Sequence, residues 1–348
     1  MFDTAPSFKM IQLMTGFWLS RAIYVAAKLG IADLLREEPK YIGELAKATC
    51  SHEPSLYRIL RALASAGIFA EDEPGRFALT PLAATLRTDV PGSLRAWVNM
   101  QSGDEQYRAW GDLLHSVKTG ETAFNHVFGM SVWQYRAQNP EQAKSFDDAM
   151  ANQTAMYNAA VISSYSFSQF KKIIDVGGGD GSLLTTILEA NPEPKGVVFD
   201  LPHVAKKAKQ RIDRAGLMQR CQVIGGDVFA SVPQGGDAYI LSRMIQSWDD
   251  TSAIEILKNC GRAMVSSGRI LIIEGVIHSG NEPDINKIFD LTMMALSGGR
   301  QRTRIEYQKL LEAAGFTLSQ IIPTESVMGV SVIEGRRAQT LDVAPNIG

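Results

Sequence analysis

One short segment restricts the fold of this chain more than any other. An apolar run over residues 173–176 contains Asp175, and four glycines follow within residues 177–181. A helical pattern of apolar residues then runs from Ser182 to Glu189. Glycine lets a backbone turn sharply and lets a ligand approach the main chain closely. The segment therefore predicts a strand, a tight turn at a ligand site and the start of a helix.

A second apolar run supplies the next element of the same pattern. Residues 196–199 read Gly-Val-Val-Phe and are followed directly by Asp200. An acid at the end of the second strand, about 20 residues after a glycine turn, can accept hydrogen bonds from a ribose diol. The sequence therefore predicts a cofactor that carries a nucleoside.

The glycine spacing narrows the choice of cofactor. The run Gly-Gly-Gly-Asp-Gly lacks the G-x-G-x-x-G spacing that holds a pyrophosphate, and no Gly-Lys-Ser/Thr follows it. The acid just before the turn, Asp175, suits a cationic ligand by Coulomb attraction. S-adenosylmethionine fits, because it has an ammonium and a sulfonium but no phosphate. A glycine turn without a ligand, in an ordinary α/β protein, is the alternative.

Composition excludes several other classes of function. At 348 residues the chain has room for two domains, and a net charge of −2 gives no indication of nucleic acid or an anionic membrane as a partner. No apolar run is long enough to span a bilayer, and no signal peptide is evident. Three widely spaced cysteines suit a reducing cytoplasm, and no two of the five histidines have the helical spacing of metal ligands. We therefore expect a cytoplasmic protein without a metal site.

The first hundred residues indicate a winged helix. Helical patterns are followed by two short β-like runs, over residues 8–35, 42–46 and 55–63 and then 67–70 and 76–80. Winged helices often bind DNA, but the last of these helices carries only Arg58 and Arg61, and the wing is not basic. A structural or dimer-forming role is favoured over DNA binding.

The rest of the chain alternates between strands and helices. After a helical stretch from Asp104 to Ser164, strands are predicted at 173–176, 196–199, 221–224, 238–242 and 269–273, with helical patterns between them. This alternation predicts a parallel sheet with helices on both faces and a ligand beyond the carboxyl ends of its strands. Polar residues fall at all five ends: Asp175, Asp200, Asp227, Ser242 and Glu274.

Together, these motifs resemble the S-adenosylmethionine-dependent small-molecule O-methyltransferases, which include plant caffeate-type enzymes and bacterial relatives from antibiotic and carotenoid pathways. The matching segments are Ile42–Ala46, Leu79–Ala83, Trp110, Thr119–Glu121, Asp175–Gly181, Phe199–Pro202, Gly226–Phe229, Gly299–Thr303 and Ala313–Phe316. The resemblance implies an α/β fold, with a winged-helix dimerisation domain over residues 1–103 and a Rossmann-like class I methyltransferase domain over residues 104–348. It also implies a homodimer, in which residues near Trp18 reach the partner's pocket.

The resemblance further assigns roles at the cofactor and acceptor sites. It implies that the cofactor is held by Asp175, Gly177, Gly179, Asp200, Leu201, Asp227, Val228, Phe229 and Ser242. Asp200 would bind the ribose, and Asp227 and Phe229 would bracket the adenine. It implies that a small-molecule acceptor is lined by Met130, Trp133, Phe146, Met150 and Met294. Ordinary core packing is the alternative for the acceptor residues.

One departure from the family pattern bears directly on catalysis. The family has His-Asp-Trp after the fourth strand, and that histidine takes the proton from a hydroxyl acceptor; here residues 246–248 read Gln-Ser-Trp. Of the two acids that flank the histidine, one matches Glu274 and the other is replaced by Gln301. A carboxamide has no usable proton affinity near neutral pH, so Gln246 cannot act as the base. General-base assistance is typically worth about 10²–10⁴-fold in rate.

Three interpretations of this departure remain open. Methyl transfer can proceed to a carbon, a nitrogen or an already ionised oxygen, with alignment supplying the rate, and we take this as the primary prediction. Glu274 can replace the base if burial raises its pKa, or it can simply orient Gln246. Alternatively, the enzyme is a cofactor-binding cyclase in which Gln246, Gln301 and Arg243 polarise a substrate carbonyl. An inert or DNA-binding protein is least compatible with the complete set of cofactor residues.

Overall fold

The computed structural model describes residues 6–326 and 329–338. They form two compact units, residues 6–111 with 133–153 and residues 112–132 with 154–326 and 329–338. These units are defined by contacts within the chain. They do not test the domain boundary at residue 103, which stays a prediction. Within the described ranges, no helix is both long and apolar enough to cross a membrane.

The first unit contains the predicted winged helix. Its elements are α1 (Pro6–Leu29), α2 (Ile31–Leu34), β1 (Lys40–Tyr41), α3 (Ile42–Ala48), α4 (Glu53–Ser65), β2 (Phe69–Glu73) and β3 (Arg76–Leu79). The three strands form an antiparallel sheet in the order β1-β3-β2. Leu56, Leu60 and Leu63 of α4 are buried because their spacing places them on one helical face. Burying each leucine contributes about 1.5–3 kcal/mol.

Short helices complete the first unit and begin the second. The structure contains α5 (Pro81–Ala84), α6 (Arg95–Gln101), α7 (Asp104–Gly111), α8 (Leu113–Thr119), α9 (Ala123–Phe128), α10 (Val132–Gln138) and α11 (Pro140–Ser164). The helical stretch predicted from Asp104 to Ser164 is therefore confirmed, although it consists of several short helices and one long one. Gly120 and Gly129 end α8 and α9 with φ angles of 78° and 70°, which favour glycine.

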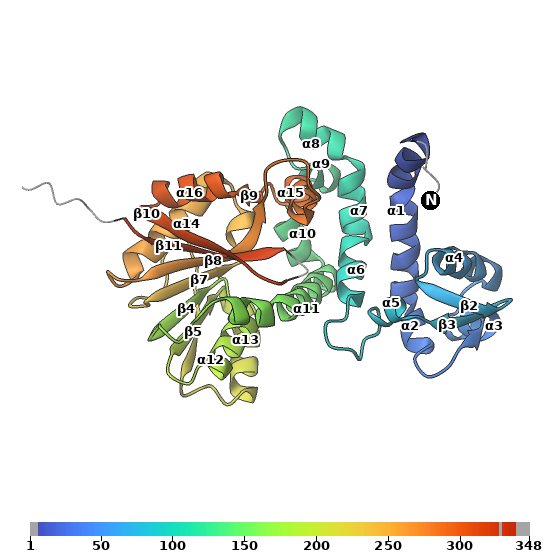
Figure 1. Ribbon diagram of the computed structural model, residues 1–348, viewed down its shortest axis with the longest axis horizontal. Coiled ribbons are helices and arrows are strands. Elements are labelled where there is room, and N and C mark those ends of the chain that lie inside the picture. The colour runs from blue at the N-terminus through green and yellow to red at the C-terminus, as the bar shows by residue number, and fades with distance from the viewer. Residues whose placement is uncertain (1–5, 327–328, 339–348) are drawn as a thin grey trace, which may run out of the picture. The chain divides into compact units, whose positions relative to one another are not determined.

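The second unit is built on an eight-stranded sheet (Figure 1). Its strand order is β10-β11-β8-β7-β4-β5-β6, and β9 pairs with β8. The strands are β4 (Lys172–Val176), β5 (Lys195–Asp200), β6 (Cys221–Gly225), β7 (Ala238–Ser242), β8 (Arg269–Ile277), β9 (Arg302–Thr303), β10 (Phe316–Pro323) and β11 (Val330–Arg337). The five predicted strands are all present and parallel. The sheet as a whole is mixed, because β10 and β11 add antiparallel strands that the sequence analysis did not predict.

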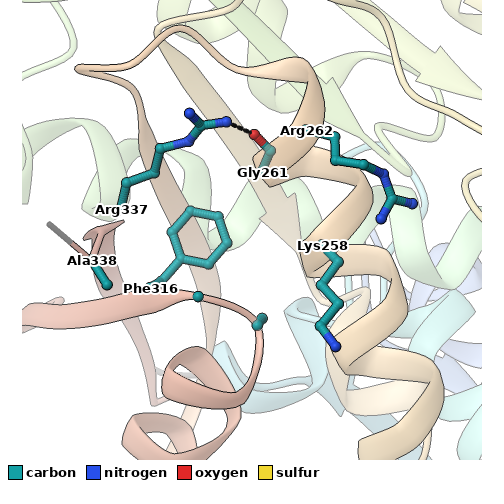
Figure 2. A pocket seen from close by; sticks show the side chains of 8 residues that line it. Lys258, Gly261, Arg262, Phe316, Arg337 and Ala338 are labelled. Carbon is teal, nitrogen blue, oxygen red and sulfur yellow. Dashed lines mark hydrogen bonds between the residues drawn. The ribbon is translucent and has the colours of Figure 1, made fainter. Parts of the chain in front are cut away.

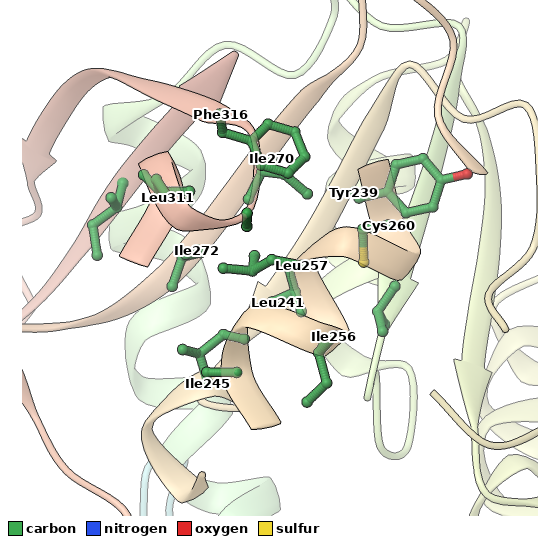
Figure 3. Packing of buried hydrophobic residues seen from close by; sticks show 14 of the residues in the cluster. Tyr239, Leu241, Ile245, Ile256, Leu257, Cys260, Ile270, Ile272, Leu311 and Phe316 are labelled. Atoms are coloured by element: carbon green, nitrogen blue, oxygen red, sulfur yellow. The ribbon is translucent and has the colours of Figure 1, made fainter. Parts of the chain in front are cut away.

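Helices cover both faces of this sheet, as predicted. They are α12 (Ser182–Ala190), α13 (Pro202–Arg214), α14 (Asp250–Ala263) and α16 (Arg304–Ala313). A further helix, α15 (Ile285–Leu296), contacts β8, α8 and α9, and a 3₁₀ turn, η1, spans Ile245–Ser247. Alternate strand residues point to opposite faces, so Ile174 and Tyr239 pack with α14 and α16, whereas Ile173 and Ile240 pack with α12 and α13. Figure 3 shows the first of these cores, where Ile256, Leu257 and Cys260 of α14 meet the strand residues.

Candidate active site

The glycine turn between β4 and α12 has the geometry that its sequence predicts. The φ angles of Gly177, Gly179 and Gly181 are 71°, 58° and 75°, in the left-handed region that favours glycine. The backbone N–H of Gly177 donates to the carbonyl of Phe199 at 2.8 Å, which joins the turn to the end of β5. A Cβ on Gly177 would lie 2.9 Å from Met244 Cγ, whereas one on Gly179 would meet nothing within 4 Å. The backbone of Gly179 is therefore accessible to a ligand.

Asp200 lies at the end of β5 and faces this turn. Its Oδ2 accepts a hydrogen bond from the Gly179 backbone N–H at 2.8 Å, and its Oδ1 accepts one from Leu201 N–H at 2.7 Å. A carboxylate oxygen has more than one acceptor position, so both oxygens retain capacity for further donors. The side chain is positioned by the backbone at the edge where a ribose diol would bind.

Asp175 is buried without a hydrogen-bond partner. Its side chain is 1% exposed, and neither carboxylate oxygen has a partner among the described residues. Burial raises the pKa of this carboxyl to about 7, and the nearby charges of Asp200 and Asp180 add to the shift. Buried polar groups are almost always paired, so this carboxylate calls for a donor or a cation. The ammonium of S-adenosylmethionine fits that requirement.

The loop after β6 is held by Asn259, a residue that was not predicted from the sequence. Asp227 Oδ1 accepts the backbone N–H of Phe229 at 2.9 Å, and the Phe229 ring meets Trp248 edge to face at 5.0 Å. Asn259, 4% exposed on α14, donates its Nδ2 to the carbonyls of Val228 at 2.7 Å and Phe229 at 3.1 Å. Asn259 therefore fixes the backbone of the predicted adenine-binding loop.

A separate hollow is lined by residues from the end of α14, the start of β10 and the end of β11. Figure 2 shows this pocket of about 260 Å³, whose walls include Lys258, Arg262 and Arg337. Arg262 donates to Asn259 Oδ1, and Arg337 donates to the carbonyl of Gly261. None of the residues that line this pocket belongs to the predicted cofactor or acceptor sets, so it is distinct from the candidate site.

The residues at the departure from the family pattern come together in one buried cluster, which we call the amide cluster: Gln246, Glu274 and Gln301. Gln246 is 6% exposed, Gln301 5% and Glu274 0%. Gln301 Nε2 donates to Gln246 Oε1 at 2.8 Å, and the backbone N–H of Gln246 donates to Glu274 Oε1 at 2.9 Å. The fold therefore joins η1, β8 and the segment before β9 through side-chain hydrogen bonds.

Glu274 has a second partner, Tyr307, whose hydroxyl donates to Glu274 Oε2 at 2.8 Å. Burial raises the pKa of the Glu274 carboxyl to about 7, although both hydrogen bonds oppose that shift. Glu274 was predicted to lie at the end of its strand, and this was wrong. β8 continues to Ile277 because it pairs with β11 and with β9 beyond Glu274. Glu274 thus contacts the backbone of Gln246 from inside the sheet.

Further contacts hold η1 in place. Arg302 is fully buried and donates to the carbonyls of Ile245 at 3.3 Å and Trp248 at 3.0 Å. The Arg300 backbone N–H donates to the Gln246 carbonyl at 2.9 Å, and a Cβ on Gly299 would come within 2.1 Å of that oxygen. Glycine is therefore required beside Gln246. The sequence signal for Arg302 was its place in the C-terminal motif, whereas Tyr307 had no local signal.

Ser242 is the last residue of β7, and Arg243 follows it at the same edge of the sheet. Ser242 Oγ lies 3.0 Å from the hydroxyl of Tyr157, a buried residue of α11. Arg243 has a φ of 53°, a left-handed conformation that is uncommon for a side chain of this size. Such strain is concentrated at functional sites, which supports the assignment of this turn to the site.

The predicted acceptor residues belong to different units. Trp133, Phe146 and Met150 lie in the first unit, whereas Met130 and Met294 lie in the second. Trp133 meets Phe146 edge to face at 5.9 Å, and the Arg136 guanidinium lies 3.9 Å from the centre of the Phe146 ring. Their role in an acceptor pocket stays a prediction.

Family models match most of the chain. The model of the O-methyltransferase domain matches residues 110–317, and that of the O-methyltransferase dimerisation domain matches residues 11–89. The chain belongs to the O-methyltransferase family. This methyltransferase is 49% identical to "Phenazine O-methyltransferase PhzM" of Lysobacter antibioticus over 94% of its own length and 95% of the relative's. It is 32% identical to "Phenazine-1-carboxylate N-methyltransferase" of Pseudomonas aeruginosa over 94% and 98% of the two chains.

Solved structures agree with this assignment. The crystal structure of LaPhzM superimposes with a TM-score of 0.91 at 48% identity, over 96% of this chain and 100% of the other. The O-methyltransferase NcsB1, in complex with S-adenosylmethionine and 2-hydroxy-5-methyl naphthoic acid, superimposes with a TM-score of 0.80 at 32% identity, over 92% and 96%. The methyltransferase therefore has the class I fold with an N-terminal dimerisation domain, as expected, and its cofactor is S-adenosylmethionine.

Proposed function

We propose that this enzyme methylates an ionised hydroxyl group on a fused-ring aromatic metabolite of the phenazine type. The observation that supports this most directly is the amide cluster, in which Gln246 stands where the family has its basic histidine. The phenazine methyltransferase that is 49% identical to this chain supports the class of acceptor.

The chemistry of the acceptor accounts for the missing base. Ring nitrogens withdraw electron density and lower the pKa of a hydroxyl on the same fused ring. A larger fraction of such a hydroxyl is ionised near neutral pH, and the anion attacks without prior proton transfer. The enzyme then contributes binding and alignment, which can replace much of the work of a base.

Gln246 has a role in this proposal as a hydrogen-bond donor. Its Oε1 accepts from Gln301 Nε2, which directs its own Nε2–H groups away from Gln301. A carboxamide N–H donates well to a phenolate oxygen, and a donor in a water-poor site stabilises an anion more strongly than water does. Glu274 holds the backbone of Gln246 in place through its bond to the N–H group.

The cofactor residues complete the mechanism. When bound, S-adenosylmethionine supplies an electrophilic methyl group on a positively charged sulfur. Asp175 and Asp200 would hold the ammonium and the ribose, and the glycine turn would bring the backbone close to the cofactor. The loop from Asp227 to Phe229 would hold the adenine.

A nitrogen acceptor is the second candidate. A ring nitrogen with a free lone pair also needs no base, and a phenazine N-methyltransferase is 32% identical to this chain. The cyclase alternative gains no support, because both curated relatives named above are methyltransferases.

We also propose that the enzyme is a homodimer. The dimerisation model matches α1 from Ile11 onward, where these apolar side chains are about half exposed or more: Ile11, Leu13, Met14, Phe17 and Trp18. Phe8 and Met10, one turn earlier on α1, are exposed in the same way. Large exposed apolar surfaces of this kind mark protein interfaces. The reach of Trp18 into a partner's pocket and a cytoplasmic location both stay predictions.

The proposal is tested by offering the purified enzyme S-adenosylmethionine with a hydroxyphenazine and with a hydroxynaphthalene of similar size. Mass spectrometry measures the methylated product and S-adenosylhomocysteine. We expect rapid O-methylation of the hydroxyphenazine, with kcat/KM rising with pH up to the pKa of the free acceptor. Acceptors with different pKa values should shift the profile accordingly. A profile that bends at one pH for every acceptor, or equal rates for both ring systems, would contradict the proposal.

A further inference from the structure

Three side chains with metal-binding atoms meet at the corner between α8 and α9, outside the residues described above. Asp112 precedes α8, His115 lies in its first turn and His126 lies in the last turn of α9. One ligand atom from each lies within 4.8 Å of those of the other two. Among the described residues, no other group of three or more such side chains meets this condition.

No metal site was expected from the sequence, because no two histidines have the helical spacing of metal ligands. The fold brings this group together in another way. Asp112 and His115 are three residues apart and share one face of the chain as it enters α8. The turn between the helices, with Gly120 in a left-handed conformation, then places α9 against α8. His126 thus reaches the same face from a neighbouring helix.

The contacts within this group leave a buried ring nitrogen, His115 Nε2, without a hydrogen bond. His126 Nδ1 lies 2.6 Å from Asp112 Oδ2, and the two imidazole rings stack with centres 3.9 Å apart and planes 6° apart. His115 Nε2 is inaccessible to solvent and has no hydrogen-bond partner in the described chain; Glu121 Oε2 lies 3.5 Å away. A buried ring nitrogen without a hydrogen bond is costly unless something binds it.

We propose that Asp112, His115 and His126 bind a divalent transition-metal ion of the zinc type. Two imidazoles and one carboxylate are a donor set that suits zinc, nickel and copper, whereas magnesium and calcium prefer oxygen atoms alone. Zinc binds such ligands at about 2.0–2.2 Å, so binding requires rotation of the imidazoles out of their stacked arrangement. Glu121 or water supplies the fourth position.

Binding at this corner has a structural consequence. The ion links the segment before α8 to the end of α9, and both helices pack against α15. α15 carries Asp290, whose Oδ1 accepts the backbone N–H of Gln301 at 2.8 Å. The ion therefore stabilises a support of the amide cluster and takes no part in methyl transfer.

The experiment is a titration of the full-length, chelator-treated protein with zinc ions. Isothermal titration calorimetry measures the binding. We expect one saturable site, together with a rise in melting temperature that grows with zinc concentration. His115→Gln and His126→Gln should each weaken binding at least ~10-fold. Cobalt ions should give the visible absorption bands of a low-symmetry site in the wild-type protein and lose them in both variants.

His278→Gln is the matched control, because His278 also pairs with a carboxylate, Asp284 Oδ2 at 3.3 Å, but has no second histidine beside it. It should bind zinc as the wild type does. Melting curves recorded with a chelator establish that each variant is folded. If a histidine variant does not fold, Asp112→Asn replaces it as the variant that removes a ligand. Absence of zinc binding in the wild type, or equal binding by the wild type and the folded variants, would overturn the proposal.

Discussion

Two buried carboxyl groups of the second unit share a pKa of about 7 but differ in their surroundings. Asp175, beside the glycine turn, has no hydrogen-bond partner in the described chain, whereas Glu274, in the amide cluster, accepts from the Gln246 backbone and the Tyr307 hydroxyl. Burial is the main cause of both shifts. The difference teaches that an unpaired buried acid is prepared for a ligand, whereas a paired one holds the protein together.

The largest expected effect comes from restoring a base beside Glu274. Gln246→His places an imidazole in the amide cluster, where it can take a proton from a neutral phenol. We expect the rate on phenols of ordinary pKa to rise by about 10²–10⁴-fold if the pocket admits them. The measurement is the initial rate of phenol methylation, with Gln246→Asn as the control that adds no base. If the histidine variant methylates no hydroxyl acceptor faster than the wild type, the account of the lost base is weakened.

The pairing of Glu274 is tested by stability rather than by activity. Because its folded pKa of about 7 exceeds the ordinary value of 4.5, the folded state binds more protons than the unfolded state between these pH values. The contribution of Glu274 to the free energy of unfolding is therefore fully present below pH 4.5. This contribution, up to about 3 kcal/mol, is lost as pH rises through about 7.

Glu274→Gln removes this titration while keeping the size of the side chain. Urea unfolding at acidic and at mildly alkaline pH should show that the wild type loses stability relative to the variant as the pH rises. A constant difference between the two proteins across that range would show that Glu274 does not titrate in this way.

On the cofactor side, Asp200→Ala should reduce the affinity for S-adenosylmethionine. The substitution removes the proposed charged acceptors for two ribose hydroxyls, each bond being worth about 1.5–3 kcal/mol, so a loss on the order of 100-fold is expected. Calorimetry of cofactor binding measures it, and Asp237→Ala, a change at a carboxylate that caps the start of β4, tests for general effects of losing an acid. Unchanged affinity in the first variant would refute the ribose role.

The unpaired state of Asp175 predicts a pH dependence of cofactor binding. A cationic ligand favours the ionised carboxyl, so binding below the pKa of about 7 must release a proton. Affinity should rise with pH by roughly tenfold per unit below pH 7 and level off above it. Asp175→Asn should weaken binding and flatten the profile. A wild-type affinity that is constant through this range would mean that Asp175 does not face the cofactor's charge.

The smallest effect is expected at Asn259, which acts on the cofactor only through the loop it supports. Asn259→Ala leaves the carbonyls of Val228 and Phe229 without a donor, which costs about 1 kcal/mol or a fewfold in cofactor affinity. Asn259→Asp keeps the shape but loses the donor and should behave in the same way. Full affinity in both variants would show that the loop holds its shape without this contact.

The sequence by itself determined the glycine turn and predicted the cofactor edge of the site, and its resemblance to the family showed that Gln246 replaces the histidine base. The glycine turn and the acids near the strand ends can be predicted from sequence because each depends on neighbouring residues in one backbone segment. The replacement at Gln246 is found by comparing such a segment with the family motif. The five parallel strands were predicted for the same reason, since short apolar runs separated by helical patterns are local features.

Only the tertiary structure decided which groups these residues contact. Tyr307 reaches Glu274 across 33 positions of the chain, and Asn259 reaches the loop at Val228 across 31. β10 and β11 joined the sheet by antiparallel pairing, and His115 met His126 through a helical corner. Partners such as these depend on how distant segments pack, and no local pattern records that packing.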